Sequence, residues 1–220
     1  MPEPNILQQQ HAANSLSSIL EEQANNNSNP IFRQSLVQVL SFKGHGKLML
    51  ICMIGILICA IYIGFSEHTI AIVKEIVDVS MTITLGLLAI FFTGYTLFQA
   101  LSTKGTLVTL LTSTTSLYTS IIPLKKVQAP IYKVYNLYFL GISYYTTLII
   151  LLNFFLKIFL ASIPEDFYIK AFSYTMNSAL ASILLIIYLL INVKLVLEVK
   201  SFLYNIYQSI LVSDVSKLSN

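Results

Sequence analysis

Charged side chains are the scarcest component of this chain. Only 10% of its 220 residues are Asp, Glu, Lys or Arg, whereas 55% are hydrophobic and the mean hydropathy is +0.74. A soluble domain carries about 25% charged residues, so this chain cannot cover a globule with ionised groups. Soluble, disordered, collagen-like and disulfide-framework classes are therefore excluded, and a polytopic membrane protein remains.

Residues that carry out chemistry are also few. The three histidines show no metal-ligand spacing, and the sequence has neither a Gly-rich phosphate loop nor a G-x-S-x-G motif. Cys52 and Cys59 lie about 10 Å apart along a helix, which is too far for a disulfide between them. We therefore expect no catalytic residue, no metal site and no cofactor. A single arginine, Arg33, argues against a nucleic-acid partner.

Long uncharged windows are what the sequence has instead. Four of them hold 19, 25, 23 and 23 residues between consecutive charges, and about 20 helical residues cross a hydrocarbon core about 30 Å thick. We predict an all-α, polytopic integral membrane protein with amphipathic cytoplasmic extensions and four transmembrane helices, at residues 48–65, 79–101, 134–156 and 171–193. No Asp, Glu, Arg or His lies inside these spans, so they lack the groups of proton relays and most pumps.

A fifth uncharged window, Gly105–Leu124, differs from the other four in its hydroxyl content. Nine of its 20 residues are Ser or Thr, and five of these follow one another from Thr112 to Ser116. A lysine pair, Lys125 and Lys126, comes directly after it. We interpret the window as a loop-side helix extension or an interfacial segment. The alternative is a re-entrant, pore-lining segment.

The basic residues set the orientation. Ten of the 13 lie before the first span, between the second and third spans, or after the fourth span. Only Lys74, Lys157 and Lys170 lie in the other two loops. Because cytoplasmic loops carry the excess of Lys and Arg, we predict that both termini are cytoplasmic. The expected location is the bacterial cytoplasmic membrane.

The chain divides into three predicted regions. Residues 1–46 form a partly disordered cytoplasmic arm with an interfacial helix at 30–43. Residues 47–200 form the four-helix transmembrane domain, and residues 195–220 form an amphipathic cytoplasmic tail. In the arm, Phe32, Leu36, Val39 and Leu40 recur on one helix side. That side suits either the membrane surface or the span bundle.

Three sets of residues are candidates for helix packing or partner binding. The first is a seam of small side chains in the second span, at spacings of three and four: Thr82, Gly86, Ala89, Thr93, Thr96 and Ala100. The second comprises polar residues of the third and fourth spans, whose asparagines need partners across helices: Ser143, Thr146, Asn153, Asn177, Ser178, Ser182 and Asn192. The third is an apolar stripe for a partner on the tail: Val196, Val199, Leu203, Ile206 and Ile210. Packing within one chain explains the first two sets, and an oligomer that lines a narrow pore is the alternative.

These features indicate a non-enzymatic multi-pass membrane protein that acts as a scaffold or accessory subunit. It would recruit a partner through its cytoplasmic arm, loop and tail. The alternative is an oligomeric pore-forming or permeability effector of the toxin, immunity or phage-defence type, and a small carrier or lipid-active enzyme comes third. Besides the lipid bilayer, the expected partner is a second copy of the chain or a membrane or cytosolic protein. Bacterial accessory subunits, immunity proteins and phage-defence components include small four-span proteins of this outline, but the likeness is one of architecture alone.

Overall fold

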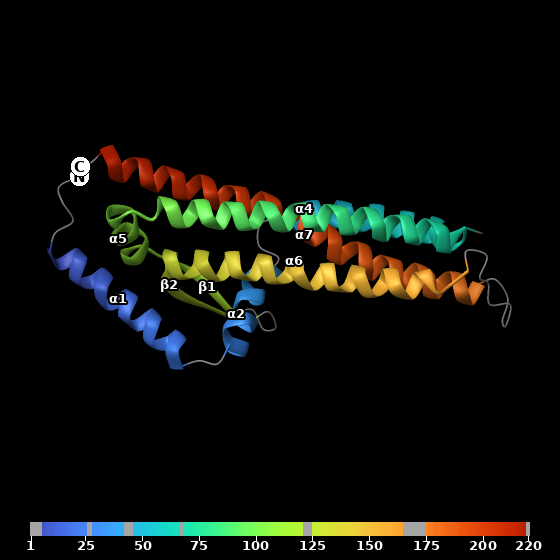
Figure 1. Ribbon diagram of the computed structural model, residues 1–220, viewed down its shortest axis with the longest axis horizontal. Coiled ribbons are helices and arrows are strands. Elements are labelled where there is room, and N and C mark those ends of the chain that lie inside the picture. The colour runs from blue at the N-terminus through green and yellow to red at the C-terminus, as the bar shows by residue number, and fades with distance from the viewer. Residues whose placement is uncertain are drawn as a thin grey trace. The chain divides into compact units, whose positions relative to one another are not determined.

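The computed structural model describes residues 6–25, 28–41, 46–66, 68–120, 125–164 and 175–218. Within these ranges the chain forms seven helices and two strands (Figure 1). In chain order they are α1 (Ile6–Asn25), α2 (Ser28–Leu40), α3 (Gly46–Gly64), α4 (Thr69–Leu101), α5 (Lys104–Thr112), β1 (Thr114–Ser120), β2 (Lys125–Pro130), α6 (Ile131–Ala161) and α7 (Thr175–Leu218).

Four helices are long and apolar enough to cross a membrane, as the uncharged windows predicted. They are α3, α4, α6 and the Leu180–Asp214 part of α7. Helix α4 begins ten residues before the predicted span, because Lys74, Glu75 and Asp78 do not interrupt a helix. Its 33 residues measure about 50 Å, so its ends would extend beyond a hydrocarbon core about 30 Å thick. The first residues of the predicted fourth span, from 171 to 174, lie outside the described ranges.

The chain divides into two compact units, and α4, α6 and α7 contribute residues to both. The first unit comprises residues 1–41, 89–145 and 198–220, and the second comprises residues 42–88 and 146–197. Each unit has its own buried side chains.

In the first unit, segments far apart in sequence pack together. Helix α1 packs on α5 through Ala12, Ile19 and Leu111. Helix α2 lies beside β1, which pairs with β2 in an antiparallel sheet that sets Leu117 opposite Val127 (Figure 1). The N-terminal arm, the loop between the second and third long helices and the tail are therefore parts of one folded unit.

The two strands are a departure from the all-α fold predicted from the sequence. A helix does follow Thr103, but it ends at Thr112, and the remainder of the Ser/Thr-rich run is extended in β1. Threonine and tyrosine favour a pleated strand because their side chains are restricted in a helix. The expectation of a helix extension was therefore right only as far as Thr112.

Aromatic rings fill the remaining core of the first unit. Phe98 and Phe139 have ring centroids 5.2 Å apart, and Phe202 of α7 lies 5.6 Å from Phe139 and 4.8 Å from Phe91. A methyl group added at Gly94 would collide with the Phe202 ring. Gly94 therefore allows α7 to approach α4 closely.

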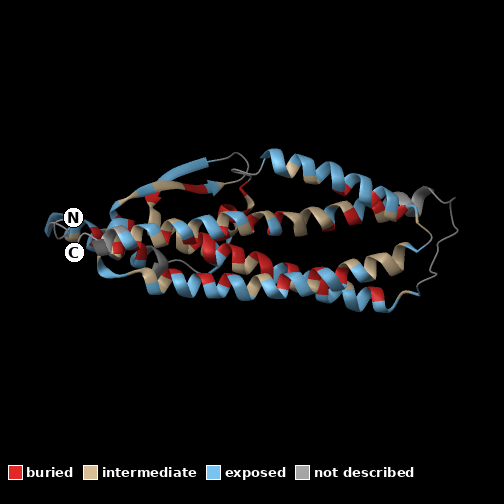
Figure 2. Ribbon diagram, turned by 90° about the horizontal axis from the view of Figure 1, so that it is seen from above, coloured by how far each residue is buried: buried red, intermediate tan, exposed pale blue. Residues whose placement is uncertain are grey.

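The second unit combines a small core with an exposed apolar exterior. Ala60, Val77, Leu160, Leu185 and Tyr188 form a buried cluster that joins α3, α4, α6 and α7. The outward faces of the long helices are exposed, as their pale blue colour shows in Figure 2, and they carry side chains such as Ile58, which is 64% exposed. Apolar surface of this extent suits a lipid environment.

Candidate functional site

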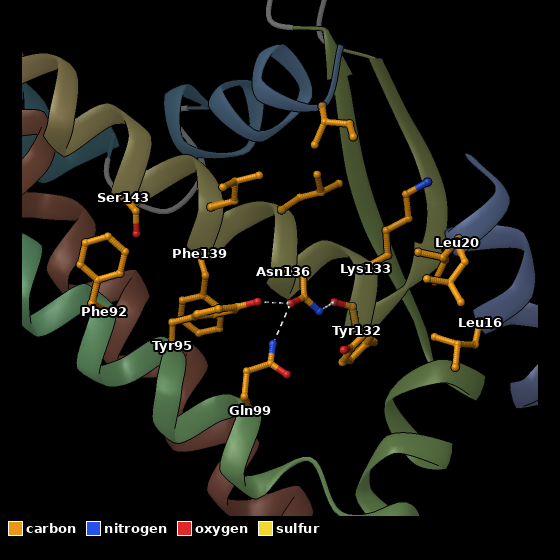
Figure 3. Close-up of a pocket in the computed structure, with 14 residues that line it drawn as sticks. Leu16, Leu20, Phe92, Tyr95, Gln99, Tyr132, Lys133, Asn136, Phe139 and Ser143 are labelled. Atoms are coloured by element: carbon orange, nitrogen blue, oxygen red, sulfur yellow. Dashed lines mark hydrogen bonds between the residues drawn. The ribbon is translucent and has the colours of Figure 1, made fainter. Parts of the chain in front are cut away.

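The first candidate site, which we name the amide cavity, lies in the first unit (Figure 3). It has a volume of about 440 Å³ and is bounded by α1, α2, α4 and α6. Leu16, Ile19 and Leu20 of α1 provide apolar walls, and Lys133 is the one charged side chain among the described residues that line it.

Asn136 is the hydrogen-bonding centre of the amide cavity. Its Oδ1 accepts hydrogen bonds from the Tyr95 hydroxyl at 3.3 Å and from Gln99 Nε2 at 3.1 Å, and its Nδ2 donates to the Tyr132 carbonyl at 2.9 Å (Figure 3). Tyr95 and Gln99 are one turn apart on α4, as are Tyr132 and Asn136 on α6, so the bonds tie the two helices together. This arrangement can hold an apolar or weakly polar group.

The second candidate site is a buried polar cluster in the second unit. Asn153 of α6 donates from Nδ2 to Ser80 Oγ at 3.0 Å, and its Oδ1 accepts from the Tyr188 hydroxyl at 2.8 Å. Ser80 in turn donates to Asn192 Oδ1 at 2.6 Å, and Asn192 Nδ2 donates to the Tyr188 carbonyl at 2.9 Å. These hydrogen bonds pair the amide groups of Asn153 and Asn192 with polar groups of the same or neighbouring helices. The cluster therefore joins α4, α6 and α7 without leaving these amides unpaired.

A groove of about 370 Å³ runs beside this polar cluster, between α4 and α7. Ser80, Thr84 and Asn192 contribute polar atoms to it, while residues such as Ile83 and Leu189 make it mainly apolar. An ion pair between Lys157 Nζ and Asp78 Oδ1, at 2.7 Å, lies nearby on α6 and α4. Both charged side chains are more than half exposed, so the pair contributes little to stability in water.

The seam of small residues is exposed in the described part of the chain. All six of its members, Thr82 to Ala100, are exposed, and a methyl group at Gly86 would meet no atom within 4 Å. The packed face of α4 carries Val77, Thr84 and Phe91 instead. Packing within one chain therefore does not explain the seam, and contact with another molecule stays a prediction.

The predicted polar residues fall into several environments. Asn153 bonds across helices as predicted, and Asn192 joins the same cluster. Thr146 and Ser182 are buried, although Ser182 Oγ has no hydrogen-bond partner among the described residues. Ser143 belongs to the first unit and lines the amide cavity, while the side chains of Asn177 and Ser178 lie outside the described set.

The residues of the tail stripe differ in their exposure. Val196 and Leu203 are more than half exposed, and of the five predicted residues only Ile206 is buried. The inward face of α7 carries Phe202 and Glu198, whose carboxylate accepts a hydrogen bond from the Tyr138 hydroxyl at 3.0 Å. Binding of a partner by the tail stripe therefore stays a prediction.

Sequence reasoning missed several residues of both sites. Ser80 lies at the edge of its predicted span, so it resembled a residue at the membrane boundary. The Thr84 hydroxyl donates to the Ser80 carbonyl one turn away. Two hydroxyl residues on the same helix face could have indicated a polar contact there. Gln99 is the lone amide of the second span, which could have marked it as a residue in need of a partner.

Neither site has the chemistry of a metal centre. In the ranges that the structure describes, no three His, Cys, Asp or Glu side chains lie close enough to hold a metal ion. Amides and hydroxyls in apolar surroundings suit helix packing and recognition by hydrogen bonds. Comparison of the chain with protein-family models, curated proteins and solved structures gives no match.

Proposed function

We propose that this protein is a non-enzymatic membrane scaffold or accessory subunit that recruits a protein partner. The observation that carries the proposal is that α1 and α2 of the arm, α5, β1 and β2 of the loop, and the tail part of α7 from residue 198 belong to the same compact unit. The proposal places both termini in the cytoplasm and the four long helices in the bacterial cytoplasmic membrane. Ten of the 13 basic residues then lie on the cytoplasmic side, which supports that orientation.

Specific contacts support treating the first unit as a defined platform. Gln38 of α2 donates from Nε2 to the Tyr118 carbonyl at 2.5 Å, and its Oε1 accepts from the Tyr118 amide at 3.2 Å. The bonds from Tyr138 to Glu198 attach the tail to α6 in the same unit. A platform held by such bonds presents its outer residues in a fixed arrangement, which lowers the entropic cost of binding.

The tail carries the surface that we assign to the partner. Leu203, Tyr204, Tyr207 and Leu211 lie on one face of α7, and they are 56%, 60%, 56% and 40% exposed. Tyrosine is enriched at protein interfaces because it offers a large apolar area with a polar end. This face adjoins the predicted tail stripe at Leu203.

The test is crosslinking followed by purification in mild detergent. We expect a defined partner, or a second copy of the chain, to be crosslinked to the tail face. Tyr204→Ser combined with Tyr207→Ser should abolish the crosslink while membrane insertion is retained. Tyr62→Ser, at a more exposed tyrosine of α3, is the control and should retain the partner. A monomer that crosslinks to nothing would contradict the proposal.

An oligomeric pore is the second candidate, and the exposed seam of α4 favours it. Small residues on an outward face allow a neighbouring helix to approach closely. However, Asn153 and Asn192, which would have to line a pore, bond to residues of their own chain. The scaffold is therefore the better supported function. Ion leakage from liposomes that contain the purified protein would reverse this preference.

A further inference from the structure

A second cavity of the first unit lies between α2 and the end of β1, and we name it the arginine cavity. It has a volume of about 660 Å³. One part of its lining is polar, with Asn29, Arg33, Thr119 and Ser120. The other part is apolar and includes Phe32, Leu36 and Leu40. It shares no lining residue with the amide cavity or with the groove of the second unit.

Arg33 gives this cavity its chemical character. It is the single arginine of the chain, it is exposed, and no carboxylate of the described residues forms an ion pair with it. A guanidinium group presents five donors in a planar fork that matches the oxygens of a phosphate. Asn29 lies one turn before Arg33 on the same face of α2, and the hydroxyls of Thr119 and Ser120 come from β1.

The surroundings of the arginine cavity are positively charged. Its described lining contains no Asp or Glu. Lys125 pairs with Ser120 across the strand ladder, and Lys126 pairs with Tyr118. Lys126 Nζ lies 5.6 Å from the centre of the Tyr118 ring. Both lysines are exposed, so an anion held by Arg33 would lie in a favourable field.

Helix α2, which provides the apolar part of the cavity, is held in place by contacts with α6 and β1. The Phe32 ring packs against Tyr144 of α6, with centroids 4.8 Å apart. Helix α2 lies so close to α6 that a methyl group at Gly141 would collide with the Ser35 carbonyl. Together with the bonds from Gln38 to Tyr118, these contacts hold α2 in place. The cavity therefore exists before any ligand binds.

We propose that the arginine cavity binds the phosphate group of an anionic membrane lipid. Arg33, Asn29 and the β1 hydroxyls would bind the phosphate oxygens, and Phe32, Leu36 and Leu40 would cover the first part of an acyl chain. A free phosphate ester has the same anionic group, but it would leave the apolar part uncovered. The apolar wall therefore favours the lipid as the source of the phosphate. This site is independent of the partner surface on the tail.

The absence of tryptophan from the chain allows a direct test. Phe32→Trp places a single fluorescent reporter in the wall of the cavity. The full-length variant is reconstituted in phosphatidylcholine vesicles that contain phosphatidylglycerol with brominated acyl chains, which quench nearby tryptophan. We expect stronger quenching by brominated phosphatidylglycerol than by the same amount of brominated phosphatidylcholine. Tyr144→Trp supplies a second reporter if Phe32→Trp does not fold.

Substitutions of charged residues in the Phe32→Trp variant distinguish a specific lipid site from nonspecific electrostatic attraction of anionic lipids. Arg33→Ala should lower the relative affinity for phosphatidylglycerol about tenfold, because charge-assisted hydrogen bonds are lost. Lys104→Ala removes one exposed positive charge elsewhere in the same unit and should leave the preference unchanged. Equal quenching by the two lipids, or equal losses in the two variants, would overturn the proposal. Displacement of the lipid by soluble glycerol phosphate at similar concentration would overturn the lipid as the source.

Discussion

At the scale of single residues, two glycines of α4 have opposite surroundings. A methyl group at Gly94 would meet the Phe202 ring, and that ring cannot move aside because it is buried between Phe91 and Phe139. At Gly86 the same methyl group would meet nothing within 4 Å. The sequence showed both glycines but not this difference, because it depends on where α7 packs.

We therefore expect Gly94→Ala to destabilise the protein and Gly86→Ala to be tolerated. Overpacking typically costs about 1–3 kcal/mol, whereas alanine in an exposed helix is more favourable than glycine by about 1 kcal/mol. Thermal unfolding in detergent, followed by circular dichroism, measures both. If Gly86→Ala proved as damaging as Gly94→Ala, the seam would have to be a packed contact in the purified protein.

Asn153 is a residue whose need for a partner was predictable, while the partners were not. An amide inside a membrane helix requires a hydrogen bond, and the structure supplies Ser80 and Tyr188. Neither partner follows from the sequence, because each lies on a different helix and the pairing depends on how the helices are rotated.

Replacement of Asn153 by Leu should destabilise the second unit by about 1–3 kcal/mol, since Ser80 and Tyr188 would lose a bond in an apolar region. A double-mutant cycle with Tyr188→Phe should give a coupling free energy of about 0.6 kcal/mol or more. Thr93→Ala serves as the control, because that exposed hydroxyl donates to the Ala89 carbonyl of its own helix. Additive effects of the two substitutions would show that the bond is not formed.

At the scale of elements, the uncharged windows located four long helices but not their ends. Charged residues indicate where a helix would leave the hydrocarbon core, whereas backbone hydrogen bonding determines where the helix itself ends. Helix α4 therefore starts at Thr69, before the charged residues that bound the uncharged window. The strands were missed for a related reason. A Ser/Thr-rich run is compatible with a loop, an interfacial helix or a strand, and only the pairing with Lys125–Pro130 selects the strand.

The contact between α2 and β1 leads to a prediction about the sheet. Gln38→Ala removes both bonds to the Tyr118 backbone and leaves a buried amide and carbonyl unsatisfied, which costs about 1–3 kcal/mol. Faster hydrogen exchange at β1 should follow, measured by mass spectrometry. Gln34→Ala, one turn earlier on α2, should leave the exchange of β1 unchanged. Unaltered exchange in Gln38→Ala would mean that the sheet does not depend on α2.

At the scale of the whole molecule, the tail is a structural part of the first unit as well as a candidate interface. Phe202 belongs to the aromatic core, and Glu198 bonds to Tyr138. Truncation after Lys194 would remove both residues and disturb the unit, so it could not isolate the loss of a partner. Substitutions at exposed tail positions are therefore the sharper experiment.

The membrane topology is the corresponding prediction for the complete chain. Reporter fusions after Phe65, Ser102, Pro164 and Asn220 should report the outer side, the cytoplasm, the outer side and the cytoplasm in turn, because ten of the 13 basic residues then lie inside. Alkaline phosphatase and green fluorescent protein fusions at the same four positions give complementary signals. An outer location for Asn220 would reject four spans with both termini inside.

The bonds between Gln38 and Tyr118 also cover one edge of the two-stranded sheet. The Gln38 side chain offers Tyr118 one donor and one acceptor, as a neighbouring strand would. It therefore occupies the position at which the edge of β1 could recruit a strand from another chain. The exposed Lys125 and Lys126 of β2 make pairing at the other edge unfavourable through charge repulsion between copies. A two-stranded sheet that would otherwise be open on both sides thus has a safeguard against amyloid-like growth at each edge.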